Sequence, residues 1–254
     1  MPQPIRRIDQ GIRKALCAVL PRSVWLRRRM KCGAIVTGQN KPGFGGRGFF
    51  IFGESLEPEL EHLDHFLEAG NVFLDVGANS GVFTMKAATC VGPGGLVVAV
   101  EPLPEMFCVL QRNVGLNGYS NVRIRNFCAG DRIGLAEFWI NFGKPNSASF
   151  TRRDQKARKY TPLCITLDEL ARLDNLSRLD YLKIDAEGAE ASVLAGAAGL
   201  LDRFKPAIQA EETLETVATL KGYRKWAWPG GPNCIFLPEG HRAEDICRRL
   251  GFRS

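Results

Sequence analysis

Apolar residues along this chain form two kinds of pattern. Apolar runs at 72–76, 96–100 and 207–210, interrupted only by Asp75 and Gln209, predict strands buried on both faces, as in a parallel sheet between two layers of helices. Between these runs, apolar residues recur at helical spacing at 82–89, 104–116 and 189–201. Because strands and helices alternate, we predict an α/β fold with a mostly parallel seven-stranded sheet and helices on both faces.

The remaining elements follow weaker patterns. Further strands are expected at 122–125, at 179–184 beside the first strand, as an antiparallel pair at 223–228 and 233–237, and after a loop within 43–52. Further helices are expected at 58–68 and 241–250. Near the N-terminus, one face of an amphipathic helix that Pro21 ends holds Ile5, Ile12, Leu16, Val19 and Leu20.

The first apolar strand ends in a carboxylate and a turn of small residues. A dinucleotide-binding fingerprint needs glycines at the first, third and sixth places of such a turn. Those places hold Gly77, Asn79 and Val82, so the fingerprint fails at two of them. A bulkier loop suits a ligand with an amino-acid moiety and a ribose, which is S-adenosylmethionine. The residues predicted to contact it are Asp75, Gly77, Ala78, Asn79 and Gly81.

The ends of the next two strands extend this prediction. Glu101 and Pro102 close the strand at 96–100, where an acidic residue can accept both ribose hydroxyls. Any doubly wound domain could carry this turn and acid. The segment 128–131 would lie near the adenine, with Cys128 or Ala129 backbone and the Asp131 side chain as base contacts. An ordinary strand-to-turn exit is the alternative.

Acidic residues also follow the strand at 179–184. Asp185 lies at its carboxyl end, the switch point where ligands bind in open α/β sheets. Glu187 and Glu190 begin the following helix, whose dipole favours carboxylates, and for Glu190 we expect only that stabilising role. Lys183 is predicted to pair with one of these acids and to hold the geometry of the site.

Four segments together resemble the FkbM family of methyltransferases. They are DVGANSG (75–81), EPLPEMFCVLQRNVGLN (101–117), LKIDAEGAEASVLAGA (182–197) and KPAIQAEE (205–212). The resemblance implies a class I methyltransferase (Rossmann-like) fold and S-adenosylmethionine as methyl donor. It also implies transfer to a hydroxyl of a saccharide or other natural-product scaffold. Methylation of an amine or a protein side chain is the alternative.

Charge divides the chain into two parts. Residues 1–31 hold nine Arg or Lys against one Asp, a net charge of +8, and the whole chain carries +7, which leaves −1 for the rest. A nucleic-acid enzyme needs a basic surface around its active site, so we predict no nucleic-acid partner. We divide the chain into a basic N-terminal helical extension, 1–31, and a methyltransferase domain, 32–254, with core motifs at about 70–237.

Cysteine spacing and hydropathy indicate the compartment. The eight cysteines include no Cys-x-x-Cys pair and no Cys/His cluster, so neither a zinc site nor a disulfide framework is predicted. The apolar run at 15–20 is too short for a signal peptide or a membrane span, and we expect a cytoplasmic protein. Residues 1–31 could contact an anionic membrane, and packing on the domain or a partner is the alternative.

The expected chemistry needs a route for the acceptor proton. A hydroxyl is a weak acid, so a general base or a metal-bound alkoxide is expected. No histidine adjoins the motifs, which leaves Asp185, Glu187 and Glu211 as bases or as ligands of a divalent cation. The basic segment 143–160 is either a lid for an anionic acceptor or a solvated insertion.

Two other functions compete with methyl transfer. A nicotinamide oxidoreductase is opposed by the failed glycine pattern. A catalytically silent, membrane-associated binding protein is suggested by the basic extension.

Overall fold

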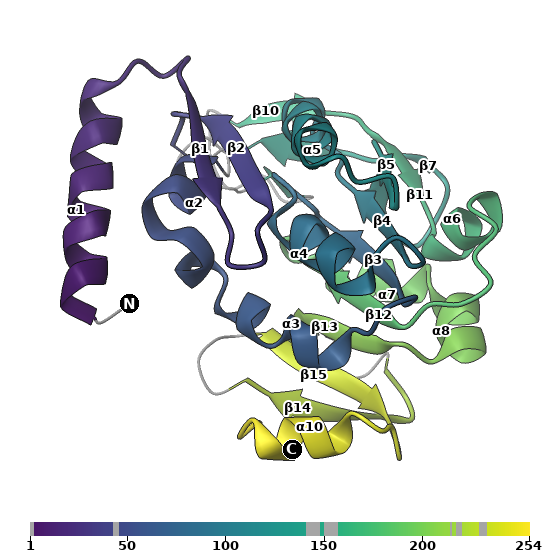
Figure 1. Ribbon diagram of the computed structural model, residues 1–254. Coiled ribbons are helices and arrows are strands. Elements are labelled where there is room, and N and C mark those ends of the chain that lie inside the picture. The colour runs from purple at the N-terminus through teal and green to yellow at the C-terminus, as the bar shows by residue number, and fades with distance from the viewer. Residues whose placement is uncertain are drawn as a thin grey trace.

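A seven-stranded sheet forms the centre of the protein. The computed structural model describes residues 3–42, 46–140, 148–149, 157–213, 215–216, 220–228 and 233–254. The strands are ordered β14 (Tyr223–Ala227), β15 (Asn233–Pro238), β13 (Ala207–Glu211), β12 (Tyr181–Ile184), β3 (Val72–Val76), β4 (Leu96–Val100) and β5 (Val122–Arg125). Strands β13, β12, β3, β4 and β5 run parallel, whereas β15 is antiparallel to both of its neighbours. The predicted α/β sheet and its antiparallel closing pair are confirmed (Figure 1).

Helices cover both faces of this sheet, as the apolar sequences of its central strands predict. All five residues of β3 are buried, and Phe73 and Leu74 face different hydrophobic clusters. The cluster around Phe73 includes residues of α4 (Val82–Val91) and α5 (Pro104–Asn117). The cluster around Leu74 includes residues of α6 (Leu167–Leu173), α7 (Glu190–Ala195) and α8 (Ala198–Phe204). Helix α10 (Glu244–Arg249) packs Cys247 into the first cluster.

The N-terminal part contains a helix, a hairpin and a second helix. Helix α1 (Gln3–Val19) precedes β1 (Trp25–Arg29), which pairs antiparallel with β2 (Ile35–Gln39). This pairing crosses the predicted domain boundary after residue 31. The strand predicted within 43–52 is wrong, because 46–52 forms helix α2 (Gly46–Phe52). A short apolar run is buried equally well by either conformation, so its burial gives no sign of which one forms.

Two predicted helices are broken into shorter pieces. The segment before β3 consists of η1 (Gly53–Leu56), η2 (Pro58–Glu61) and α3 (Leu63–Phe66) instead of one helix at 58–68. The helix predicted at 189–201 is divided into α7 and α8 at Gly196. There the backbone approaches β6 so closely that a Cβ on Gly196 would lie 2.0 Å from the Gly130 oxygen.

Short strands lie between β5 and α6. They are β6 (Cys128–Ala129), β7 (Gly134–Leu135), β8 (Phe138–Ile140), β9 (Ala148–Ser149), β10 (Arg158–Tyr160) and β11 (Leu163–Ile165). Of the predicted lid, 143–147 and 150–156 lie outside the described residues. Residues 229–232, which connect β14 and β15, also lie outside the described residues. Within the described chain, no helix is long and apolar enough to cross a membrane.

Candidate functional site

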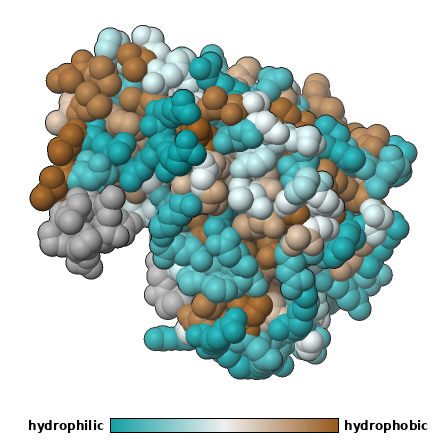
Figure 2. Space-filling view, viewed as in Figure 1, coloured by the Kyte–Doolittle hydropathy of each residue, from teal (hydrophilic) through white to brown (hydrophobic). Residues whose placement is uncertain are grey.

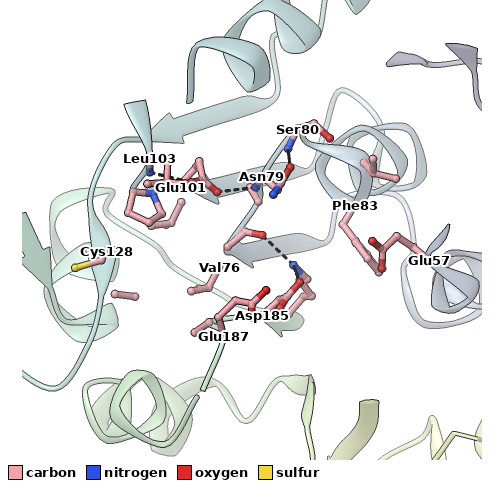
Figure 3. Close-up of a pocket in the computed structure, with 18 of the residues that line it drawn as sticks. Glu57, Val76, Asn79, Ser80, Phe83, Glu101, Leu103, Cys128, Asp185 and Glu187 are labelled. Atoms are coloured by element: carbon pink, nitrogen blue, oxygen red, sulfur yellow. Dashed lines mark hydrogen bonds and ion pairs between the residues drawn. The ribbon is translucent and has the colours of Figure 1, made fainter. Parts of the chain in front are cut away.

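A cavity of about 330 Å³ lies at the carboxyl ends of the central parallel strands (Figure 3). This volume falls in the range of small-molecule sites. Residues that follow β3, β4 and β12 line it, together with residues of β6, β8 and the segment before β3. The lining comprises Leu56, Glu57, Val76, Gly77, Ala78, Asn79, Ser80, Val82, Phe83, Val100, Glu101, Pro102, Leu103, Cys128, Ala129, Phe138, Lys183, Asp185, Ala186 and Glu187.

The turn after β3 forms one wall and depends on a glycine. Gly77 has φ +74°, and a Cβ at this position would lie 2.0 Å from the Asp185 backbone oxygen. The N–H groups of Gly77 and Ala78 both donate to the Val100 oxygen, at 3.0 Å each. The turn is therefore held between the ends of β4 and β12, where a side chain at 77 would not fit.

Glu101 connects the turn after β3 to the segment that follows β4. Its Oε2 accepts the Asn79 N–H at 2.7 Å and its Oε1 accepts the Leu103 N–H at 2.9 Å. Each carboxylate oxygen can accept a second hydrogen bond, so both can still take a ligand hydroxyl. Burial raises the pKa of Glu101 to about 7, against the two N–H donors, which lower it.

A buried ion pair lies beneath the turn. Asp75 is fully buried, and its Oδ2 accepts the Thr84 hydroxyl at 2.6 Å. The Lys183 ammonium lies 3.4 Å from Asp75 Oδ1 and 3.6 Å from Asp185 Oδ2, and it donates to the Gly77 oxygen at 3.1 Å. Burial lowers the pKa of Lys183, but the carboxylates of Asp75, Asp185 and Glu57 raise it above its ordinary value. The predicted pairing of Lys183 with a neighbouring acid is thus present, and Lys183 is charged.

Three carboxylates besides Glu101 line the cavity, those of Asp185, Glu187 and Glu57. The Asp185 side chain is 63% exposed, so it lies at the cavity mouth. Glu187 follows in the left-handed region at φ +51°. Glu190 does not line the cavity, because its Oε1 accepts the N–H groups of Ala186 and Gly188 at 3.0 and 3.2 Å. This role in holding the turn agrees with the structural function expected for Glu190.

Glu57 is the third carboxylate, and no sequence motif pointed to it. It lies between η1 and η2, on a different element from the motif residues, and Figure 3 shows it beside Phe83. Burial raises the pKa of Glu57 to about 7; Lys183 lowers it, whereas Asp185, Glu59 and Asp75 add to the rise. Among the described residues, none donates a hydrogen bond to its carboxylate. Within the described residues, the Glu57 carboxylate therefore lines the cavity without accepting a hydrogen bond.

The other predicted site residues divide into two groups. Pro102, Cys128 and Ala129 line the cavity as expected. Gly81 lies behind it as the N-cap of α4, where a Cβ would lie 2.6 Å from Leu110. Asp131 and Glu211 are also absent from the lining of this cavity, and both are exposed. Most of the predicted site residues thus line one cavity, whereas Gly81, Asp131 and Glu211 do not, and neither does Asp75, which is buried beneath the turn.

Several lining residues had no sequence signal. Phe83 and Phe138 line the cavity from α4 and β8, and Leu56 accompanies Glu57. These apolar residues resemble ordinary core positions in the sequence, so only the fold reveals them. In the part of the chain that the structure describes, no three His, Cys, Asp or Glu side chains are grouped so that they could hold a metal ion.

Comparison with known proteins agrees with this architecture. The model of the FkbM methyltransferase domain matches residues 75–254. Methyltransferase 1 of Beauveria bassiana (strain ARSEF 2860) is 25% identical over 169 residues, which cover 56% of this chain and 68% of that protein. The protein-L-isoaspartate O-methyltransferase of Methanococcus aeolicus is 31% identical over 72 residues, 28% of this chain. The match spans only 32% of that protein.

A solved structure of an FkbM methyltransferase from Methylobacillus flagellatus KT is also similar. Its TM-score is 0.45 at 15% identity, and the match covers 75% of this chain and 52% of that one. The family model covers well over half of the chain and includes the turn after β3, Glu101 and the acidic segment after β12. The chain belongs to the FkbM family of S-adenosylmethionine-dependent methyltransferases.

Proposed function

We propose that this methyltransferase transfers a methyl group to a hydroxyl of a saccharide or other natural-product scaffold. One observation carries the proposal: a single cavity joins Glu101 and the turn after β3 to a group of carboxylates around a buried ammonium. The first part suits a nucleoside with an amino-acid tail. The second part suits an acceptor that must lose a proton.

The lining residues fit the proposed donor. Glu101 would accept the ribose hydroxyls, since each of its oxygens retains acceptor capacity beyond one backbone N–H. Cys128, Ala129 and Phe138 offer a mostly apolar wall for the adenine. Gly77, Ala78 and Asn79 line the cavity and would contact the amino-acid moiety. When bound, the donor supplies an activated methyl group on a sulfonium.

The residues of the chain must then align the acceptor and remove its proton. The acceptor oxygen forms a bond to carbon as the sulfur–carbon bond breaks, and the hydroxyl proton passes to a base. Asp185 and Glu187 are candidates that line the cavity, and Glu57 joins them. Glu211, the remaining candidate from the sequence, lies outside the lining.

Glu57 suits the base role for two reasons. A general base works best when its pKa lies near the working pH, and the pKa of Glu57 is raised to about 7. In addition, its carboxylate has no hydrogen-bond donor among the described residues and remains available to an acceptor. Asp185, by contrast, lies 3.6 Å from the Lys183 ammonium and would position that charge beside the acceptor.

An acceptor screen tests the proposal. Wild-type protein with radiolabelled donor is incubated with panels of hydroxylated metabolites, nucleotide-linked and lipid-linked sugars, amines and peptides. The expected result is label in an ether linkage on a hydroxylated compound. Label found only on amines or peptides would contradict hydroxyl transfer and support methylation of an amine or a protein side chain. If the protein binds the donor but labels no compound in any panel, it would instead be a catalytically silent binding protein.

A further inference from the structure

Helix α1 packs on the protein with its polar side. Asp9 lies on this inner side, where its carboxylate pairs with Arg13 at 2.9 Å and with Arg28 at 3.6 Å. The Asn40 side chain donates to the backbone oxygens of Cys17 and Leu20, both at 2.9 Å. These polar contacts hold the helix in place together with an apolar cluster in which Cys17 packs on Leu26 and Ile51.

The apolar side of the same helix faces away from the protein. Four residues form this apolar stripe, and their exposed fractions are 64% for Ile8, 64% for Ile12, 42% for Leu16 and 78% for Val19. Spacings of four, four and three place them on one face. Figure 2 shows apolar atoms along this outer edge of the molecule. A row of exposed large aliphatic residues on one helix face marks an interaction surface.

The charge of the N-terminal segment indicates the partner. Residues 1–31 carry a net charge of +8, and the basic side chains that are exposed include Arg7, Lys14, Arg22, Arg27 and Arg29. A second copy of this chain would bring two such basic segments together, and like charges repel. Anionic lipid headgroups would instead complement them while the acyl region covers the stripe. Trp25, 39% exposed, supplies an aromatic residue of the kind enriched at bilayer interfaces.

We propose that the apolar stripe of α1 inserts into the interface of a bilayer that contains anionic lipid, with the exposed basic side chains on the headgroups. The enzyme is then a peripheral membrane protein whose helix lies in the plane of the surface. The proposal goes beyond methyl transfer and depends only on α1 and its surroundings.

Vesicle co-sedimentation of the full chain tests this. The probes are vesicles of phosphatidylcholine with 30% phosphatidylglycerol, and vesicles of phosphatidylcholine alone, at about 0.1 M salt, where the Debye length is about 10 Å. Wild type is expected to bind the anionic vesicles at least about tenfold more strongly than the neutral ones. The double variant Ile12→Ser/Leu16→Ser keeps all charges and is expected to weaken binding to anionic vesicles by about tenfold or more.

The control is Ala18→Ser, which places a hydroxyl at an exposed position outside the stripe. It should bind within about threefold of wild type, because no large apolar group is lost. Helical circular dichroism and S-adenosylhomocysteine titration verify that each variant is folded. Wild type that stays off anionic vesicles at low salt overturns the proposal. So does a wild-type dimer that becomes monomeric only in the stripe variant, because the stripe would then be covered by a second copy.

Discussion

Glu101 serves both the fold and the proposed donor with one carboxylate. Its two oxygens fix the backbone of Asn79 and Leu103, which shapes the turn and the start of the next helix. The same oxygens face the cavity. Because burial raises the pKa of Glu101 to about 7, its charge changes in the physiological range.

We therefore expect donor affinity to rise with pH. The ionised carboxylate accepts ribose hydroxyls more strongly, so S-adenosylhomocysteine should bind more tightly as pH increases from 6 to 8, with a plateau above about 7. In Glu101→Gln this dependence should flatten, and affinity at pH 8 should fall about tenfold, which corresponds to about 1.4 kcal/mol. Calorimetry at several pH values measures both. Glu57→Gln serves as the control and should keep the slope; a slope that persists unchanged in Glu101→Gln would contradict the assignment.

Glu57 is expected to affect chemistry more than donor binding. In Glu57→Gln the shape is kept and the base is lost, so turnover with an acceptor from the screen should fall by about a hundredfold or more. Affinity for S-adenosylhomocysteine should stay within about threefold. The rise of wild-type kcat through pH 7 should disappear in the variant, although Lys183, Asp185, Glu59 and Asp75 still surround the position.

Asp185→Asn provides the comparison for this experiment. If it abolishes the pH dependence while Glu57→Gln keeps it, Asp185 is the base, as first predicted from the sequence. A loss of donor affinity of tenfold or more in Glu57→Gln would instead assign Glu57 to the donor site.

At the scale of elements, the turn between β3 and α4 holds the site together. Gly77→Ala would place a methyl group 2.0 Å from the Asp185 oxygen at a residue with φ +74°. We expect destabilisation by about 3 kcal/mol or more and loss of donor binding, because β12 must move away. Thermal unfolding and calorimetry measure the two effects.

Gly70→Ala is the control that separates the effect of backbone strain from the effect of a steric clash at Gly77. Gly70 has φ +85° but no atom within 4 Å of a Cβ, so only the backbone conformation resists substitution. Its cost should be about 1 kcal/mol, a fall in Tm of about 2–4 °C, with donor binding intact. Equal effects of the two substitutions would show that close packing at Gly77 is unimportant.

Elements also explain what the sequence could and could not predict. The apolar runs at 72–76 and 96–100 predicted strands correctly, because a parallel sheet covered by helices buries both faces of each strand. The strand predicted within 43–52 was wrong, because a helix buries the same apolar residues equally well. Site residues that end these strands, such as Gly77, Glu101 and Asp185, were predictable from topology. Glu57 comes from a turn outside the motifs, and only tertiary packing brings it to the cavity.

The whole molecule combines a nearly neutral catalytic body with a basic N-terminal part. The charge difference was visible in the sequence, but the orientation of α1 was not. An amphipathic pattern predicts that the apolar face is buried, but here most of that face is exposed, and the helix contacts the protein through Asp9, Arg13 and Cys17. We expect methyl transfer to need only the body, whereas α1 would determine where the enzyme meets its acceptor.

Calorimetric titration of the purified full chain with S-adenosylhomocysteine, with NADH as comparator, tests the central assignment most directly. The cavity and its Glu101 predict one binding site for S-adenosylhomocysteine and no measurable heat with NADH. Binding of NADH without binding of S-adenosylhomocysteine would contradict the assignment of this cavity as a methyl-donor site.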